Sequence, residues 1–130
     1  MNTQSIVKQN QQFYKNISKQ FSNTRQYSWK GWDEVFNQID IKDKDTIIDI
    51  ACGNGRFLKF LNKKYKSDFE YFGLDYDENL LNTAINEFKD KNNIKFIKFD
   101  VINNLKKLKN NFNIVVAFGI THHIPDYEFR

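Results

Sequence analysis

The feature that most constrains the fold is an apolar segment that runs through a glycine turn directly into a helical pattern. Residues 46–50 (Thr-Ile-Ile-Asp-Ile) predict a buried strand, and residues 55–65 have the apolar spacing of a helix. Gly53 and Gly55 lie at the turn, where glycine permits left-handed backbone angles and a close approach to the main chain. The positive end of the helix that follows favours a polar or anionic ligand. The sequence therefore predicts a turn that binds a cofactor.

The chain continues from this turn as an alternation of strand and helix patterns. Strands are predicted over residues 46–50, 70–74, 94–99 and 112–118, and helices over residues 55–65, 78–91 and near Leu105. The apolar run from Ile114 to Ala117 predicts a strand that is buried on both faces. This alternation predicts α/β architecture with a parallel, doubly wound, Rossmann-like sheet.

Two amphipathic helices are expected before the glycine turn. Apolar residues recur at helical spacing in two groups, Phe13, Ile17 and Phe21, and then Trp32, Val35, Phe36 and Ile39. We expect residues 1–40 to form a helical cap and residues 41–130 to form the cofactor-binding α/β domain.

Acidic side chains lie at or near the ends of three successive predicted strands. Asp75 lies twenty residues beyond Gly55, Asp49 lies in the first strand and Asp100 follows the third. Parallel strands bring their carboxyl ends to one edge of the sheet, where open α/β folds bind ligands. A carboxylate there can accept hydrogen bonds from the two hydroxyl groups of a ribose. The pattern predicts an adenosine-containing cofactor, although each acid taken singly is also typical of a helix cap.

Other cofactor classes fit the glycine turn less well. A nicotinamide or flavin dinucleotide fold has a third glycine at the position of Leu58 and a leading glycine at the position of Ala51. A phosphate-binding P-loop has a Gly-Lys-Ser/Thr sequence after the turn, which this chain lacks.

The motif from Asp49 to Gly55 resembles the first motif of the class I S-adenosylmethionine-dependent methyltransferases, and the resemblance spans residues 46–126. It implies a sheet of strand order 3-2-1-4, with the C-terminal half of the methyltransferase fold missing from this chain. It also implies S-adenosylmethionine as the cofactor. By the resemblance, the residues that bind it are Asp49, Ala51, Gly53 and Gly55 around the methionine part, Asp75 at the ribose, and Asp100 and Val101 at the adenine.

A second resemblance concerns the methyl acceptor. Residues 13–25 with Trp29, and residues 119–124, are similar to segments of the eukaryote-type tRNA methyltransferases that esterify 5-carboxymethyluridine at the wobble position. The resemblance implies O-methylation of a carboxylate on tRNA, with His123 as a positioning or proton-handling group and Arg25 over the cofactor or an anionic acceptor. A structural loop role for His123 and a solvated surface role for Arg25 stay open. A small-molecule acceptor and a non-catalytic cofactor-binding fragment are the alternatives.

Composition adds expectations about surroundings and partners. The single cysteine, Cys52, fits a reducing compartment, and neither a zinc cluster nor any other metal site is expected. The net charge of +4 suits RNA as well as an ordinary solvated surface. The sequence has no bilayer-length apolar segment and no signal-peptide core, so we expect a cytoplasmic protein without a membrane partner. An apolar fourth strand at an open sheet edge predicts a partner chain or self-association.

Overall fold

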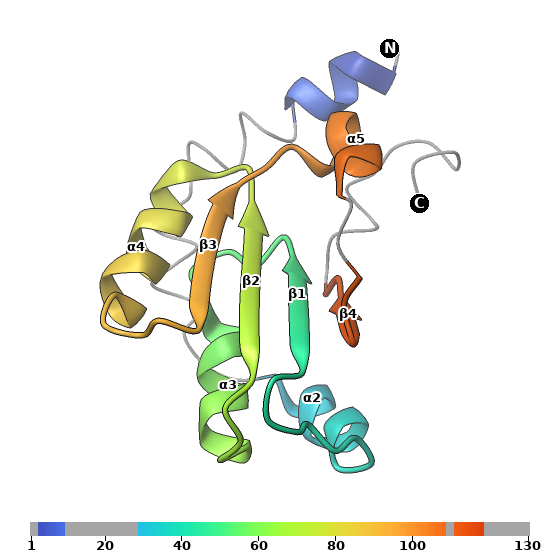
Figure 1. The fold of residues 1–130 in the computed structure, drawn as a ribbon. Helices are drawn as coiled ribbons and strands as arrows, with labels where there is room; N and C mark the ends of the chain where they lie inside the picture. The colour runs from blue at the N-terminus through green and yellow to red at the C-terminus, as the bar shows by residue number, and fades with distance from the viewer. Residues whose placement is uncertain (1–2, 10–28, 109–110, 119–130) are drawn as a thin grey trace.

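The computed structural model describes residues 3–9, 29–108 and 111–118 of the chain (Figure 1). Residues 3–9 form a short helix. The elements that follow are α2 (Lys30–Phe36), β1 (Thr46–Ile50), α3 (Arg56–Lys64), β2 (Glu70–Asp75), α4 (Glu78–Phe88), β3 (Ile94–Lys98), α5 (Val101–Asn104), the 3-10 helix η1 (Leu105–Lys107) and β4 (Ile114–Val116).

The strands form one parallel sheet in the order β3-β2-β1-β4, which confirms the predicted fold class and strand order. The register places Asp49 of β1 opposite Gly73 of β2 and Val116 of β4. The arrowheads of β1, β2 and β3 in Figure 1 point toward one edge of the sheet, where the glycine turn and the end of β2 meet.

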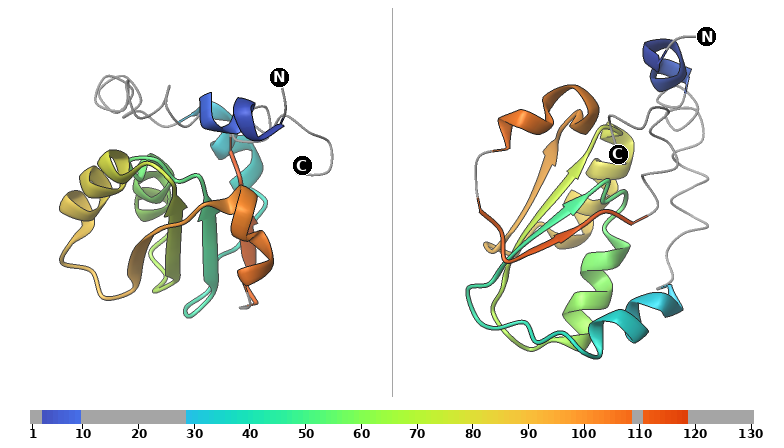
Figure 2. Two further views of the ribbon diagram at one scale, coloured as in Figure 1. Left: turned by 90° about the horizontal axis from the view of Figure 1, so that it is seen from above. Right: turned by 90° about the vertical axis from the view of Figure 1, so that its right-hand side faces the viewer.

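Helices α3 and α4 cover one face of the sheet (Figure 2). Four apolar residues within five positions make the buried side of α3: Phe57, Leu58, Phe60 and Leu61. Helix α4 begins at an N-cap, because Asp77 Oδ1 accepts hydrogen bonds from the backbone N–H groups of Asn79 and Leu80. It buries Leu80, Leu81, Ala84 and Phe88 and ends at Phe88, three residues before the predicted end.

Helix α2 shares the core of α3, since Trp32 stacks on Phe57 with ring centroids 5.1 Å apart. The prediction that Val35 faces the core is wrong, because this side chain is 51% exposed. The helix ends at Phe36, so the helical spacing does not continue to Ile39. The group of Phe13, Ile17 and Phe21 lies outside the described residues, and the division at residue 40 stays a prediction.

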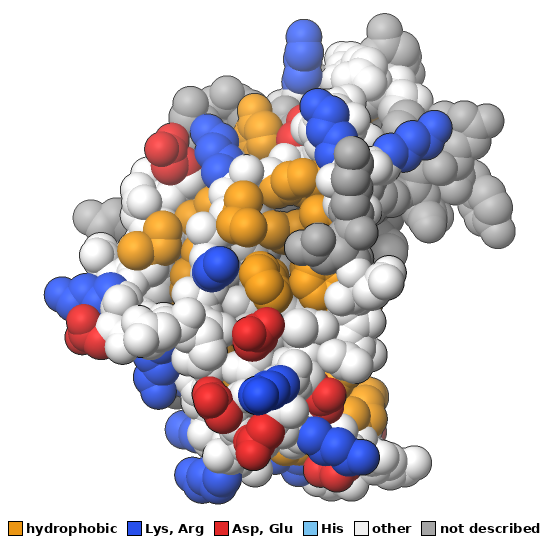
Figure 3. Space-filling model, in the orientation of Figure 1, with side chains coloured by type: hydrophobic (Ala, Val, Ile, Leu, Met, Phe, Trp, Pro, Cys, Tyr) orange, Lys and Arg blue, Asp and Glu red, His pale blue; other side chains and the backbone are white. Residues whose placement is uncertain are grey.

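The opposite face of the sheet faces the viewer in Figure 3, where apolar side chains gather over the strands, and the described helices leave much of this face uncovered. Val115 of β4 is 61% exposed and Ile97 of β3 is 43% exposed. The prediction that the fourth strand is buried on both faces is therefore wrong for Val115, because no described element covers this side of β4. Among the described residues, no helix has the length and apolar character required to cross a membrane.

Candidate cofactor-binding site

The glycine turn between β1 and α3 is built from left-handed backbone conformations. Ala51, Gly53 and Gly55 have φ angles of 62°, 58° and 86°. A Cβ atom added to Gly53 would meet no atom within 4 Å, so the main chain there is open to a ligand. A Cβ atom added to Gly55 would lie 3.0 Å from the ring of Phe88, so that glycine also lets α4 pack against the turn.

Ala51 carries a strain that the sequence pattern did not indicate. A left-handed conformation costs a residue with a Cβ atom about 1–2 kcal/mol, and only glycine adopts it freely. The turn retains this conformation because the next residue, Cys52, donates its backbone N–H to the carbonyl oxygen of Leu74 at 2.9 Å. The side chain of Cys52 is buried against Gly73, where an added Cβ atom would lie 2.9 Å from its sulfur.

Asp75 joins the end of β2 to the glycine turn. Its Oδ2 accepts a hydrogen bond from the backbone N–H of Gly53 at 2.8 Å, and its Oδ1 accepts one from the backbone N–H of Asp77 at 2.8 Å. Burial raises the pKa of Asp75, and these two hydrogen bonds oppose that rise. Each carboxylate oxygen has a further lone pair, so Asp75 can hold the turn and still accept hydrogen bonds from a ligand.

Asp49 lies beneath the turn and is only 2% exposed. Its Oδ2 accepts a hydrogen bond from the hydroxyl of Tyr71 at 2.6 Å. Burial raises the pKa of Asp49 from 3.8 to about 7; the Tyr71 hydrogen bond and the charge of Arg56 oppose the rise, and the charge of Asp75 adds to it. The motif indicated Asp49, but sequence reasoning missed Tyr71, whose spacing within β2 reads as an ordinary core position.

Asp100 and Val101 lie where β3 passes into α5. The backbone N–H of Phe99 donates to the carbonyl oxygen of Asp75 at 2.9 Å, which holds this segment beside the end of β2. Asp100 Oδ1 accepts from the backbone N–H of Asn103 at 3.3 Å, and its Oδ2 accepts from the Asn103 side chain at 2.6 Å. Asp100 thus makes the helix-capping contact that the sequence left open, and its contact with adenine stays a prediction.

The structure thus brings Asp49, Ala51, Gly53, Gly55 and Asp75 together at one edge of the sheet, with Asp100 and Val101 at the adjoining strand end. Arg25, His122 and His123 lie outside the described residues. In the part of the chain that the structure describes, no group of three histidine, cysteine or acidic residues is placed to hold a metal ion.

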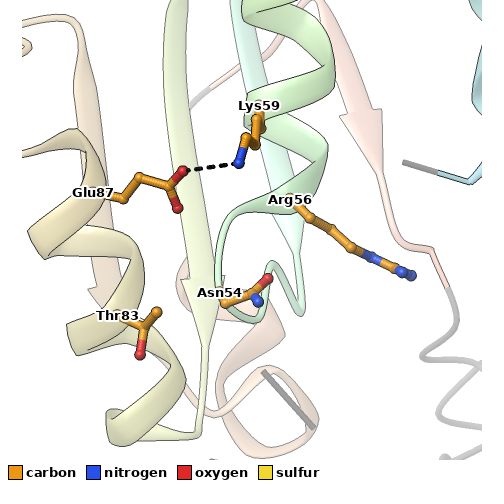
Figure 4. Close-up of a pocket in the computed structure, with 5 residues that line it drawn as sticks. All are labelled: Asn54, Arg56, Lys59, Thr83 and Glu87. Atoms are coloured by element: carbon orange, nitrogen blue, oxygen red, sulfur yellow. Dashed lines mark ion pairs between the residues drawn. The ribbon is translucent and has the colours of Figure 1, made fainter. Parts of the chain in front are cut away.

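A separate polar groove of about 100 Å³ adjoins the turn between α3 and α4 (Figure 4). Lys59 and Glu87 bridge it with an ion pair of 3.4 Å, and Asn54 and Thr83 complete the lining with Arg56. Figure 4 shows the Arg56 side chain directed away from the other lining residues, and its guanidinium lies 5.2 Å from the ring centroid of Trp32. None of the site acids lines this groove, so we distinguish it from the cofactor site.

A parallel sheet with a glycine turn after a central strand and acids at the adjoining strand ends defines a Rossmann-like protein that binds a nucleoside cofactor. Residues 47–130 match the family model described as a methyltransferase domain. The chain therefore belongs to the methyltransferase domain family, which confirms the class predicted from the sequence.

A curated relative, the demethylmenaquinone methyltransferase of Staphylococcus saprophyticus subsp. saprophyticus, is 30% identical over 94 residues. That alignment covers 72% of this chain and 40% of the relative, so the chain spans less than half of that protein's length.

Two solved structures have a similar fold. Phosphoethanolamine N-methyltransferase 1 of Haemonchus contortus, in complex with phosphoethanolamine and S-adenosylhomocysteine, has a TM-score of 0.66 at 15% identity, covering 90% of this chain and 26% of that one. A putative methyltransferase of Haloferax volcanii, in complex with the Trm112 methyltransferase activator, has a TM-score of 0.61 at 16% identity, covering 85% of this chain and 50% of that one. With the family match, these findings support S-adenosylmethionine as the cofactor.

Proposed function

We propose that this chain is the cofactor-binding part of an S-adenosylmethionine-dependent methyltransferase. The single observation that carries the proposal is the link between Gly53 and Asp75, which joins an open stretch of main chain to a carboxylate at the same sheet edge. The cofactor supplies an electrophilic methyl group on a sulfonium. Transfer of that group is an in-line displacement, which a protein assists chiefly by alignment and by exclusion of water.

Each site residue has a role in this proposal that follows from its chemistry. The Asp75 carboxylate would accept hydrogen bonds from the ribose hydroxyls of the cofactor, and the main chain at Gly53 would lie against its methionine part. In its ionised form, Asp49 would supply a negative charge near the cationic groups of the cofactor. Asp100 and Val101 would meet the adenine.

For the acceptor, our first candidate is the carboxylate of a modified wobble uridine in tRNA. It rests on the resemblance of residues 13–25 and 119–124, which lie outside the described residues. A carboxylate is already anionic at neutral pH, so this reaction requires no strong general base. His123 would position the acceptor and Arg25 would neutralise its charge.

A small-molecule acceptor is the second candidate, and the curated relatives favour it. The Staphylococcus saprophyticus relative is named for demethylmenaquinone, which is a quinone, and it aligns over 94 residues, or 72% of this chain. The third candidate is a fragment that binds the cofactor but is inactive alone. The exposed apolar residues on the uncovered face of the sheet, such as Val115, are compatible with it. The Haloferax volcanii neighbour forms a complex with a methyltransferase activator, and a protein partner of this kind is compatible with the third candidate.

Calorimetric titration with S-adenosylhomocysteine tests the core of the proposal. We expect saturable 1:1 binding by the wild-type chain and binding at least about tenfold weaker by Asp75→Asn, because the variant loses an anionic acceptor of charge-assisted hydrogen bonds. Asp90→Asn makes the same chemical change at an exposed position outside the site and serves as the matched control. Equal affinity in all three proteins would contradict the assigned role of Asp75.

The acceptor is tested with S-adenosylmethionine labelled in its methyl group. Label transferred to tRNA that carries 5-carboxymethyluridine, and removed by mild alkali as an ester, would support the first candidate. Label transferred to a demethylated quinone would support the second. Cofactor binding without transfer to either acceptor would support the inactive fragment.

A further inference from the structure

The buried pair of Tyr71 and Asp49 is the part of the site that the proposed roles leave unexplained. Both side chains belong to the central strands, and their exposed fractions are 0% and 2%. The hydroxyl of Tyr71 donates to Asp49 Oδ2 at 2.6 Å. A hydroxyl on a fully buried ring in a sheet core is costly unless it has a partner, and this one is directed at the acid beneath the glycine turn.

The strand register explains how these two side chains meet. Asp49 lies opposite Gly73, and Tyr71 lies two residues before Gly73 on the same face of β2. Gly73 has no side chain, and the ring of Phe96 fills the space where its Cβ atom would lie, at 2.7 Å. The rings of Tyr71 and Phe96 make an edge contact with centroids 5.8 Å apart, which leaves the phenol little rotational freedom.

Four titratable or charged groups of the described residues act on Asp49 from the elements around it. They are Tyr71 and Asp75 on β2, Cys52 in the turn and Arg56 on α3. Burial raises the pKa of the Cys52 thiol and of the Tyr71 hydroxyl well above their ordinary values, so both groups are neutral at physiological pH. Tyr71 is the neutral group that donates a hydrogen bond to Asp49, and this hydrogen bond favours the ionised form of Asp49.

We propose that Tyr71 is a positioning residue that favours the ionised form of Asp49 and fixes its orientation, and that it thereby sets how tightly the site binds the cationic methionine part of the cofactor. The inference rests on the proposed function, because it takes the charge of Asp49, beneath the turn, to act on that part of the cofactor. Tyr71 does not itself reach a ligand, since its side chain is wholly buried.

The first test is the titration of Asp49 in the ligand-free chain. Carbon-13 NMR of the aspartate carboxyl groups, assigned with Asp49→Asn, gives the half-titration pH of Asp49 in wild type and in Tyr71→Phe. We expect the half-titration pH to rise by about one unit in the variant, because a hydrogen bond to the charged form is lost. An unchanged titration would overturn the proposal, whatever the cofactor does.

The second test is S-adenosylhomocysteine affinity from pH 6 to pH 9. Because the titration of the ligand is common to both proteins, we compare the affinity ratio of wild type to Tyr71→Phe at each pH. With Asp49 half ionised near pH 7, an upward shift of about one unit lowers the ionised fraction roughly fivefold. We therefore expect affinity to fall roughly fivefold at pH 7 and to recover to nearly wild type at pH 9.

Two controls separate this proposal from loss of structure and from failure of the proposed function. Tyr65→Phe removes another hydroxyl that bonds within the fold, to Phe36 and Ile39, and should leave the affinity ratio near one at every pH. In the Asp49→Asn background, Tyr71→Phe should have no pH-dependent effect on affinity. Binding with a ratio that is constant in pH would overturn this inference alone, whereas no binding by wild type at any pH would overturn the proposed function as well.

Discussion

Replacing Asp49 by asparagine should change how the stability of the chain depends on pH. The wild-type carboxyl has a pKa of about 7 in the folded state against 3.8 when unperturbed, so the folded chain binds more protons than the unfolded chain between these pH values. The contribution of Asp49 to the free energy of unfolding therefore falls as pH rises from about 4 to about 7 and is level outside that window. A shift of about three units corresponds to roughly 4 kcal/mol. The side chain is nearly inaccessible to solvent, so screening by water reduces this figure little.

Asparagine keeps the size of the side chain and an oxygen that can accept from Tyr71, but it does not ionise. At each pH we compare the free energy of unfolding of Asp49→Asn with that of wild type. We expect this difference to shift in favour of Asp49→Asn by roughly 4 kcal/mol between pH 4 and pH 8. Urea denaturation followed by the fluorescence of the buried Trp32 measures it at each pH.

Asp90→Asn is the matched control, because it makes the same change at an exposed position. Its difference from wild type should stay nearly constant with pH. A constant difference for Asp49→Asn as well would refute the reasoning, since it would mean that folding does not perturb the ionisation of Asp49.

Three further predictions concern the turn, the sheet core and the open face. Ala51→Gly should raise the free energy of unfolding by about 0.5–1 kcal/mol, because glycine adopts a positive φ without strain, and an equal or lower urea midpoint would contradict this. Gly73→Ala should lower it by about 1–3 kcal/mol, since the new methyl group would lie 2.7 Å from the ring of Phe96; a neutral effect in the same assay would show that the ring moves aside. Val115→Lys should reduce concentration-dependent self-association in sedimentation velocity, because it places a charge on an exposed apolar strand, and sedimentation equal to that of wild type would exclude this face as the contact.

Local pattern was sufficient for most of the fold. The strand from Thr46 to Ile50 follows from short-range periodicity, and the parallel sheet follows from the alternation of strand and helix patterns. The strand order was implied by the resemblance to the methyltransferase family. The end of α4 was predicted less accurately, because polar residues after Phe88 are as common in a last helical turn as in a loop.

The sequence by itself determined the class of this protein. A glycine turn after a buried strand and an acid after the next strand are short patterns of neighbouring residues, so they can be recognised without knowledge of distant contacts. Only the tertiary structure decided what the acids touch. The hydrogen bonds from Tyr71 to Asp49 and from Gly53 to Asp75 join residues 22 positions apart. Such contacts depend on strand register, which periodicity along one strand does not contain. The exposure of Val115 has the same origin, because burial depends on which elements pack across the sheet.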